Sequence, residues 1–305
     1  METINPQQEH AQSLAELHYE ISEFIKTFEP LWEKHLLGER RQRPFCRLSL
    51  CEIMTILVAY QLMGGQHFKQ FYQDVICQYH RPEFPRLVSY QRFVEAAPLT
   101  TIPLVLFLQF RMEMSAQTGL YVIDSTALAV CLNLRIKRHK VFKNIAQRSK
   151  TSTGWFYGFK LHLVINHLGQ LMALQITAGN VDDRIPVLQL VKKLKGKLLG
   201  DKGYIKQTLL RQLFEQGLQL ITTLRKNMKP QVMTYLDRLL LRKRSIIETI
   251  NDLLKNHFQI EHSRHRSLAG FINCVLTGLI AYTFYPNKPA IRGVELQKAL
   301  ALVSP

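Results

Sequence analysis

The chain has 305 residues and carries 40 Lys and Arg against 23 Asp and Glu, a formal net charge of +17. Since 47% of the residues are hydrophobic, the chain can form a sizeable core, which excludes an intrinsically disordered protein. The positive charge indicates a polyanionic partner, with nucleic acid favoured over an acidic membrane surface.

Export and membrane insertion are not expected for this chain. Residues 1–11 are polar and lack the basic and then apolar pattern of a signal peptide. The longest apolar runs are interrupted before the ~18 residues that a membrane span needs. The five cysteines are scattered without a C-x-x-C pair, so we expect reduced core thiols of a cytoplasmic protein rather than zinc ligands.

Residues 1–118 are predicted to be helical. Apolar side chains recur at helical spacing over 14–36, which indicates a first amphipathic helix. Ser49 precedes Glu52 by three residues, and this is the pattern of a capping box that starts a helix ending near Met63.

A glycine turn at Gly64 and Gly65 separates this helix from further helical spacing over 68–78. Two helices joined by a short glycine turn are typical of a helix-turn-helix DNA reader, and equally of an ordinary helical hairpin. Both interpretations stay open on this pattern. Two more helices are expected over 89–95 and 102–116.

The pattern changes at Tyr121, where apolar and β-branched runs begin to dominate. Strands are predicted over 121–130, 159–166, 171–177, 197–200 and 218–223. Helices are predicted over 183–194, 205–216 and 234–257. Three strands followed by alternating helices and strands predict an α/β domain with a mixed sheet.

Positive charge is concentrated in four clusters. No Asp or Glu occurs between Ser125 and Val181, and this stretch holds seven basic residues close together: Arg135, Lys137, Arg138, Lys140, Lys143, Arg148 and Lys150. Three smaller clusters lie at 225–229, 242–244 and 264–266. A single basic run is usually a solvated face, whereas four clusters on both sides of the candidate acids favour binding to phosphates.

Three acidic residues stand out by their context. Asp124 lies near the middle of the first predicted strand, where a carboxylate is costly unless something pairs with it. Asp201 directly follows strand 197–200, at the edge of an α/β sheet where ligands bind. Glu248 lies inside the last predicted helix, four residues after Arg244, and this spacing alone favours an ordinary surface ion pair.

Together, the three acids suggest a metal site. Cleavage of a phosphodiester needs an activated water or hydroxyl group and relief of negative charge on the leaving oxygen. Two Mg²⁺ or Mn²⁺ ions bound by carboxylate oxygens supply both. We therefore expect Asp124, Asp201 and Glu248 to hold two such ions.

Four motifs of this part of the chain resemble those of the DDE transposases of bacterial insertion sequences, which have the RNase H-like fold of the retroviral integrase superfamily. Residues 122–126 are similar to the first-strand motif, 179–183 to the loop after the third strand, and 199–204 to the motif of the second acid. The resemblance covers about 119–285.

The fourth motif is the signature of the third acid, formed here by Arg244, Glu248 and Lys255. Many relatives carry a tyrosine three residues before the arginine, and Leu241 stands at that position here. This departure removes one element of the signature and leaves the three charged residues in place.

The resemblance implies an RNase H-like mixed sheet flanked by helices over 119–285. A helical DNA-binding or dimerisation domain over 1–118 would precede it, and a tail over 286–305 would follow it. The same resemblance implies that the three acids are catalytic metal ligands. Lys255 would contact a phosphate near the transposon end, and Arg244 would position the helix or the DNA. Lys202 and the seven basic residues between 135 and 150 are further candidates for DNA contacts.

Other polar residues near these motifs are expected to be structural. Asp182 and Asp183 are the main rivals for a metal role, and we expect them to cap the helix predicted to start there. Asp252 is a weaker rival for Glu248. His162 and His167, near the predicted hairpin, are also expected to be structural.

The implied activity is that of a transposase that binds the terminal inverted repeats of its element, cleaves DNA with Mg²⁺ or Mn²⁺, and joins the freed 3′ hydroxyl to target DNA. Because two ends must be held together, we expect at least a homodimer on DNA, acting at the nucleoid in the bacterial cytoplasm. A catalytically inactive DNA-binding protein and an RNase H-like nuclease without strand transfer are the alternatives.

Overall fold

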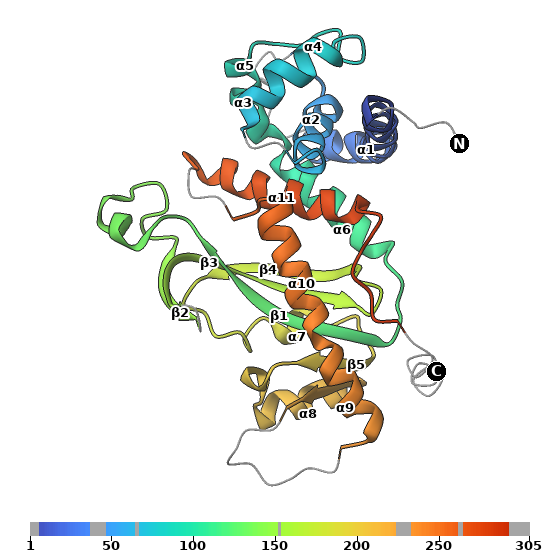
Figure 1. The fold of residues 1–305 in the computed structure, drawn as a ribbon, viewed down its shortest axis with the longest axis vertical. Helices are drawn as coiled ribbons and strands as arrows, with labels where there is room; N and C mark the ends of the chain where they lie inside the picture. The colour runs from blue at the N-terminus through green and yellow to red at the C-terminus, as the bar shows by residue number, and fades with distance from the viewer. Residues whose placement is uncertain are drawn as a thin grey trace. The chain divides into compact units, whose positions relative to one another are not determined.

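The computed structural model describes residues 6–36, 47–64, 67–151, 154–223, 233–261 and 265–292 (Figure 1). It divides into two compact units. The first comprises the chain up to Arg111 with His257–Ile260 and Arg266–Tyr285, and the second comprises Met112–Asn256, Glu261–His265 and the chain from Pro286. The basic cluster predicted at 225–229 and the residue Arg264 lie outside the described residues.

The described residues of the first unit form helices. These are α1 (Pro6–Leu36), α2 (Leu50–Leu62), α3 (Phe68–Gln70), the π-helix η1 (Phe71–Ile76), α4 (Cys77–Tyr79), α5 (Tyr90–Ala96), the 3₁₀ helix η2 (Ala97–Thr100), α6 (Thr101–Glu113) and α11 (Leu268–Phe284). Helix α11 contacts α2 and η2. Its Asn273 side chain donates to the carbonyl of Ala97 at 2.8 Å and accepts from the Thr101 hydroxyl at 2.7 Å. The last of the described helices is therefore part of the amino-terminal helical unit.

The predicted capping box at the start of α2 is confirmed. The Ser49 hydroxyl accepts the backbone N–H of Glu52 at 3.2 Å, and the Glu52 carboxylate accepts the backbone N–H of Ser49 at 2.7 Å. Two backbone groups that the helix itself leaves unpaired are thus satisfied reciprocally.

The continuous helical stretch Tyr90–Glu113 is long and apolar enough to cross a membrane, by length and composition only. The sequence predicts no such helix, because its apolar runs are interrupted by polar residues. Leu104 and Phe107 of this stretch are buried, and the Phe107 ring contacts those of Phe24 and Phe284. One such helix is weak evidence for a membrane span, since a buried core helix passes the same test.

The second unit is built on a six-stranded sheet with the order β2-β3-β1-β5-β6, in which β4 also pairs with β3. The strands are β1 (Leu120–Ala129), β2 (Gln147–Thr151), β3 (Gly154–Asn166), β4 (Leu171–Ala178), β5 (Gly196–Gly200) and β6 (Leu218–Thr222). The pairs β1/β3, β2/β3 and β3/β4 are antiparallel, whereas β1/β5 and β5/β6 are parallel. The predicted α/β fold with a mixed sheet is therefore confirmed.

Helices and short turns connect and cover these strands. They are η3 (Asn133–Arg138), α7 (Val187–Leu190), η4 (Lys202–Tyr204), α8 (Gln207–Glu215), α9 (Tyr235–Arg242), η5 (Lys243–Ser245), α10 (Ile246–Asp252) and η6 (Leu253–His257). One face of the sheet forms a core with α7 and α8, to which Tyr121, Ile123 and Val164 contribute. The side chain of Asp124 points to the opposite face, because successive residues of a strand alternate, and α10 contacts β1. Figure 1 shows α9 and α10 following one another across the strands of the sheet.

Gly158 allows three strands to meet. It pairs with Ala129 of β1 and with Gln147 of β2. A Cβ atom at this position would lie 2.0 Å from the carbonyl oxygen of Leu128. Only glycine therefore permits this close approach of β1 to β3.

Several predicted boundaries differ from the structure. The helix expected over 183–194 is reduced to α7, and the helix expected over 234–257 is divided into α9, η5, α10 and η6. Strand β2 was not predicted. Helix α11, which the predicted domain over 119–285 included, contacts α2 and η2 of the first unit.

Candidate active site

The candidate site lies where β5 stops and β1 continues. Residues Leu120–Val122 of β1 pair with β5, which ends at Gly200, while β1 continues to pair with β3 as far as Ala129. Val122 pairs with Leu199, so the same register brings Asp124 level with Asp201, the first residue after β5. Beyond Val122, one edge of β1 has no strand neighbour among the described residues. We call this segment the open edge of β1.

Asp124 is held by α10 at this edge. The side-chain amide of Asn251 donates a hydrogen bond to Asp124 Oδ2 at 3.2 Å. Burial raises the pKa of Asp124 to about 6, and the carboxylates of Glu248 and Asp201 add to the rise. The backbone N–H of Ser125 and the guanidinium of Arg244 oppose it. The other two predicted acids, Glu248 and Asp201, therefore act electrostatically on the Asp124 carboxylate, and so does Arg244.

Arg244 and Glu248 form the helix-surface ion pair that their spacing suggested. The guanidinium lies 3.0 Å from Glu248 Oε1, and the two side chains are 22% and 56% exposed. An exposed pair at this spacing contributes only a few tenths of a kcal/mol to stability. Its consequence is positional, because Arg244 fixes the orientation of the Glu248 carboxylate.

Asp201 has a local structural partner as well. Its Oδ1 accepts the backbone N–H of Lys202 at 2.7 Å and caps η4.

Tyr204, which ends η4, is buried. Its burial raises the pKa of its phenol most, and the negative charge of Asp124 raises that pKa further. The carboxylates of Asp183 and Asp201 raise this pKa too. Sequence reasoning included Tyr204 in a motif without giving it a role.

The donor atoms at this edge fit a hard divalent cation. Among the described residues, no three His, Cys, Asp or Glu side chains converge as a ready-made metal-binding group. Asn251 is only 6% exposed, and its Oδ1 has no hydrogen-bond partner within the described structure. A buried amide oxygen beside the Asp124 carboxylate is a ligand that Mg²⁺ and Mn²⁺ accept. The chemistry of Asp124, Asp201, Glu248 and Asn251 is therefore compatible with such an ion.

Lys255 is engaged by a residue that sequence reasoning missed. Its ammonium lies 2.9 Å from Oε2 of Glu261, whose Oε1 accepts the backbone N–H of Ala129 at 2.9 Å. The Glu261 carboxylate thus pairs with the Lys255 ammonium through one oxygen and accepts the Ala129 N–H, the last of the open edge, through the other. No sequence signal could have revealed this role, because Glu261 lies beyond η6 and outside every motif.

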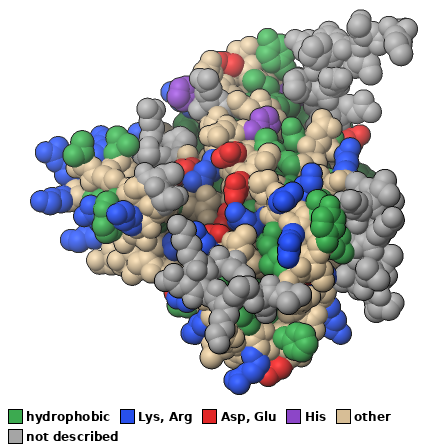
Figure 2. Space-filling view, turned by 60° about the horizontal axis from the view of Figure 1, so that its bottom comes forward, with side chains coloured by type: hydrophobic (Ala, Val, Ile, Leu, Met, Phe, Trp, Pro, Cys, Tyr) green, Lys and Arg blue, Asp and Glu red, His purple; other side chains and the backbone are tan. Residues whose placement is uncertain are grey.

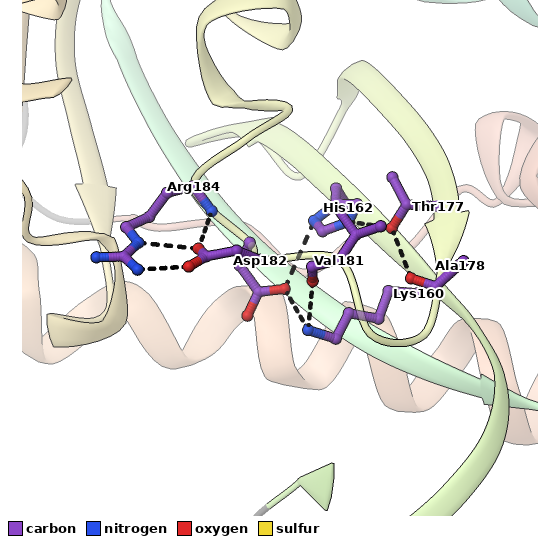
Figure 3. Close-up of polar contacts among 8 residues, drawn as sticks. Lys160, His162, Thr177, Ala178, Val181, Asp182 and Arg184 are labelled. Carbon is purple, nitrogen blue, oxygen red and sulfur yellow. Dashed lines mark hydrogen bonds and ion pairs between the residues drawn. The ribbon is translucent and has the colours of Figure 1, made fainter. Parts of the chain in front are cut away.

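The loop after β4 has a polar network of its own (Figure 3). Asp182 accepts the backbone N–H of Arg184 at 2.9 Å and also bonds its guanidinium, which holds the pKa of Asp182 well below its usual range. Lys160 donates to the Asp183 carboxylate at 2.9 Å and to the Val181 carbonyl at 3.0 Å.

The prediction that Asp182 and Asp183 cap the following helix is wrong. Helix α7 begins at Val187, after Pro186, and has no side-chain cap. Buried His162 shares a hydrogen bond of 2.8 Å with the Thr177 hydroxyl and lies 3.9 Å from Asp183. Asp183 is therefore tied to β3 by Lys160 and His162.

The seven basic residues between 135 and 150 lie on η3, on the turn that follows it, and on the edge strand β2. All seven are exposed: Arg135, Lys137, Arg138, Lys140, Lys143, Arg148 and Lys150. Figure 1 shows the η3 segment extending from the sheet at the left of the view. Figure 2 shows Lys and Arg side chains gathered with hydrophobic ones at the same side. We call residues 132–150 the basic arm.

The family described as "Transposase DDE domain" matches residues 114–268, slightly more than half of the chain. The chain belongs to the DDE transposase family. The matched segment of this transposase contains Asp124, Asp201, Glu248 and Lys255, begins next to the start of the second unit at Met112, and ends at the first residue of α11. The family assignment therefore rests on the sheet-containing unit.

Two further comparisons complete the description of this transposase. No curated protein matches its sequence. A solved structure of the piggyBac transposase synaptic complex with hairpin DNA is similar over 95% of this chain and 78% of that chain, with 13% sequence identity and a TM-score of 0.47.

Proposed function

We propose that this transposase is encoded by a bacterial insertion sequence, binds the terminal inverted repeats of that element, and catalyses metal-dependent cleavage and strand transfer. The observation that carries the proposal is Asp124, a carboxylate on the open edge of β1 that lies level with Asp201 and accepts a hydrogen bond from α10, the helix that carries Glu248. The order β4-β3-β1-β5-β6, antiparallel through β1 and then parallel, supports the proposed RNase H-like fold.

Asp124, Asp201 and Glu248 would hold two Mg²⁺ or Mn²⁺ ions, and the buried oxygen of Asn251 is a further candidate ligand. Bound ions would supply activation of the attacking oxygen and stabilisation of the leaving oxygen. The residues of the chain contribute the rest. Asn251 orients the Asp124 carboxylate, and Arg244 orients that of Glu248.

The proposed reaction has two steps. In the first, water attacks a phosphodiester at the end of the element, a P–O bond forms to the water oxygen, and the 3′ oxygen leaves as a hydroxyl. In the second, that 3′ hydroxyl attacks a phosphodiester of the target, and the 3′ oxygen of the target strand leaves. Each step forms one P–O bond and breaks one, and the attacking oxygen loses its proton.

Basic residues around the acids would hold the DNA. Lys255 is paired with Glu261, and a phosphate would replace that carboxylate as its partner. Lys202 is exposed directly after Asp201. The basic arm would bind the backbone of the duplex, with at least two copies of the chain pairing the two ends. The proposed place of action is the nucleoid in the bacterial cytoplasm.

Cleavage of DNA that carries the inverted repeats flanking the gene tests this function. With Mg²⁺, the wild-type protein should nick the repeat end and join it to a target plasmid. Asp124→Ala, Asp201→Ala and Glu248→Ala should each reduce cleavage by about a hundredfold or more, because each removes a ligand. Asp252→Ala is the matched control on α10, since its exposed carboxylate should be dispensable.

The outcomes separate the alternatives. Binding of the repeats without cleavage at any Mg²⁺ or Mn²⁺ concentration would identify a catalytically inactive DNA-binding protein. Cleavage without joining would identify a nuclease. Loss of activity in Asp252→Ala with retention in Glu248→Ala would transfer the third acidic role to Asp252.

A further inference from the structure

Trp155 is an exposed aromatic residue beside the basic arm. It lies at the start of β3 and is 51% exposed. It pairs with Lys150 of β2, so the two side chains and that of Arg148 share one face of the hairpin. The guanidinium carbon of Arg148 lies 4.7 Å from the centroid of the Trp155 ring. A cation therefore holds the ring in place while half of the residue remains accessible.

The surface around Trp155 is apolar as well as basic. Leu132 is 69% exposed and Leu134 is 96% exposed. Asn133, between them, donates a hydrogen bond of 2.7 Å to the backbone carbonyl of Trp155. This bond ties the first turn of the arm to the aromatic residue. Single exposed hydrophobic residues are normal, but here Leu132 and Leu134 flank the residue that is bonded to Trp155.

The charge of this surface indicates which kind of partner it binds. The arm carries seven basic residues, and no acidic residue occurs between Ser125 and Val181. Basic side chains alone fit the backbone of a duplex, whose bases are stacked and hidden. A basic surface with an accessible aromatic ring fits a strand whose bases are unpaired, since any base can stack on the ring.

We propose that Trp155 and Arg148 form a stacking platform for an unpaired nucleobase of the bound DNA. The platform rests on the proposed transposase function and adds a ligand class to it: the arm binds the phosphates, and Trp155 binds a base that has left the duplex. The platform gives the protein a preference for DNA that is melted or frayed near the arm.

Fluorescence of Trp155 tests the platform directly. The chain has two tryptophans, Trp32 and Trp155, so Trp32→Phe leaves one reporter. The full-length protein is titrated, in EDTA, with a blunt duplex and with a duplex of equal charge that ends in an unpaired thymidine tail. The tailed duplex should quench the fluorescence at least twice as strongly, because a base stacks on the ring only when it is unpaired.

Binding assays without the Trp32 substitution give an independent measure. Trp155→Ala should lose about tenfold in affinity for the tailed duplex, as expected for one lost stacking contact, and should keep its affinity for the blunt duplex. Trp155→Phe should retain most of the preference. Phe214→Ala is the matched control, because Phe214 on α8 is also an exposed aromatic residue, 75% exposed.

Each other outcome has a definite meaning. Equal quenching by both duplexes, or an unchanged preference in Trp155→Ala, overturns the platform and leaves the proposed transposase function intact. Failure to bind either DNA overturns the proposed function and the platform with it. A blue shift that grows with protein concentration in the absence of DNA identifies a contact between copies of the chain and also overturns the platform.

Discussion

At the scale of single residues, Asp124 is costly to the metal-free protein. Burial and neighbouring carboxylates raise its folded pKa to about 6, above the ordinary value of an aspartate. Between these two pKa values the unfolded chain has lost the proton that the folded chain still holds. Stability therefore falls as pH rises through this window and stays at the lower value above it.

Asp124→Asn should accordingly stabilise the metal-free protein at pH 7.5 by about 1–3 kcal/mol. The asparagine keeps an oxygen that can accept from Asn251 and removes the charge. Urea unfolding in EDTA at pH 7.5 and pH 5.0 measures the effect, which should shrink at the lower pH. Equal effects at both pH values would show that the charge of Asp124 is not the cause.

Glu261 offers a second test at this scale. Glu261→Gln should keep an acceptor for the Ala129 N–H and remove the negative charge beside Lys255. Loss of that charge should tighten DNA binding several-fold and steepen the dependence of log K on log salt concentration by about one unit. Glu215→Gln, on exposed α8, is the control. An unchanged slope would mean that Lys255 does not contact phosphate.

At the scale of elements, the start of α2 depends on one hydroxyl. Ser49→Ala should remove the acceptor for the Glu52 N–H and lower the free energy of unfolding by about 1 kcal/mol. Ser49→Thr should retain most of the stability, since its hydroxyl can cap the helix. Thermal unfolding of the two variants measures the difference. Equal midpoints would indicate that water replaces the cap without cost.

Local signals such as this one explain what sequence could predict. The capping box, the β3/β4 hairpin and the position of Asp201 after β5 depend on neighbouring residues or on apolar runs, and the structure contains all three. Asp124 is conspicuous in the sequence because it is a charge within an apolar strand, and Asp201 because it directly follows one. In the folded sheet the two aspartates come level with each other, because β1 and β5 are paired neighbours and Asp201 directly follows β5.

Contacts distant in sequence explain what could not be predicted. Strand β2 is an edge strand that, among the described strands, pairs only with β3, and its polar residues show no apolar alternation. The pairing of Lys160 with Asp183 and the position of Glu261 beside Ala129 depend on the folded sheet. The division of the long predicted helix at η5 likewise has no proline or glycine to signal it.

At the scale of the whole molecule, the helical unit is completed by the far end of the chain. Buried residues of α11 contribute to a core that also contains Leu104 and Phe107 of α6. A fragment of residues 1–118 should therefore be helical by circular dichroism yet lack a cooperative unfolding transition. Fusing residues 257–292 to it through a flexible linker should restore that transition. Cooperative unfolding of the short fragment alone would contradict this role of α11.

The net charge of +17 makes DNA affinity a property of the whole surface. Replacing Lys137, Lys140 and Lys143 of the basic arm with glutamine should reduce the slope of log K against log salt by about two to three units. Replacing three exposed lysines elsewhere, Lys192, Lys193 and Lys206, provides a control of equal charge. Equal losses in both variants would show that the arm has no special part in binding.

The open edge of β1 has a consequence for assembly and solubility. An unpaired strand edge is a template on which a strand of another molecule can add, which leads to aggregation. Here the Glu261 carboxylate accepts the backbone N–H of Ala129 at the end of the open edge, and Asp124 lies near its start. A strand that added there would strip water from an unpaired charge. The carboxylate proposed to hold the metal thereby also protects the protein from polymerising through its own sheet.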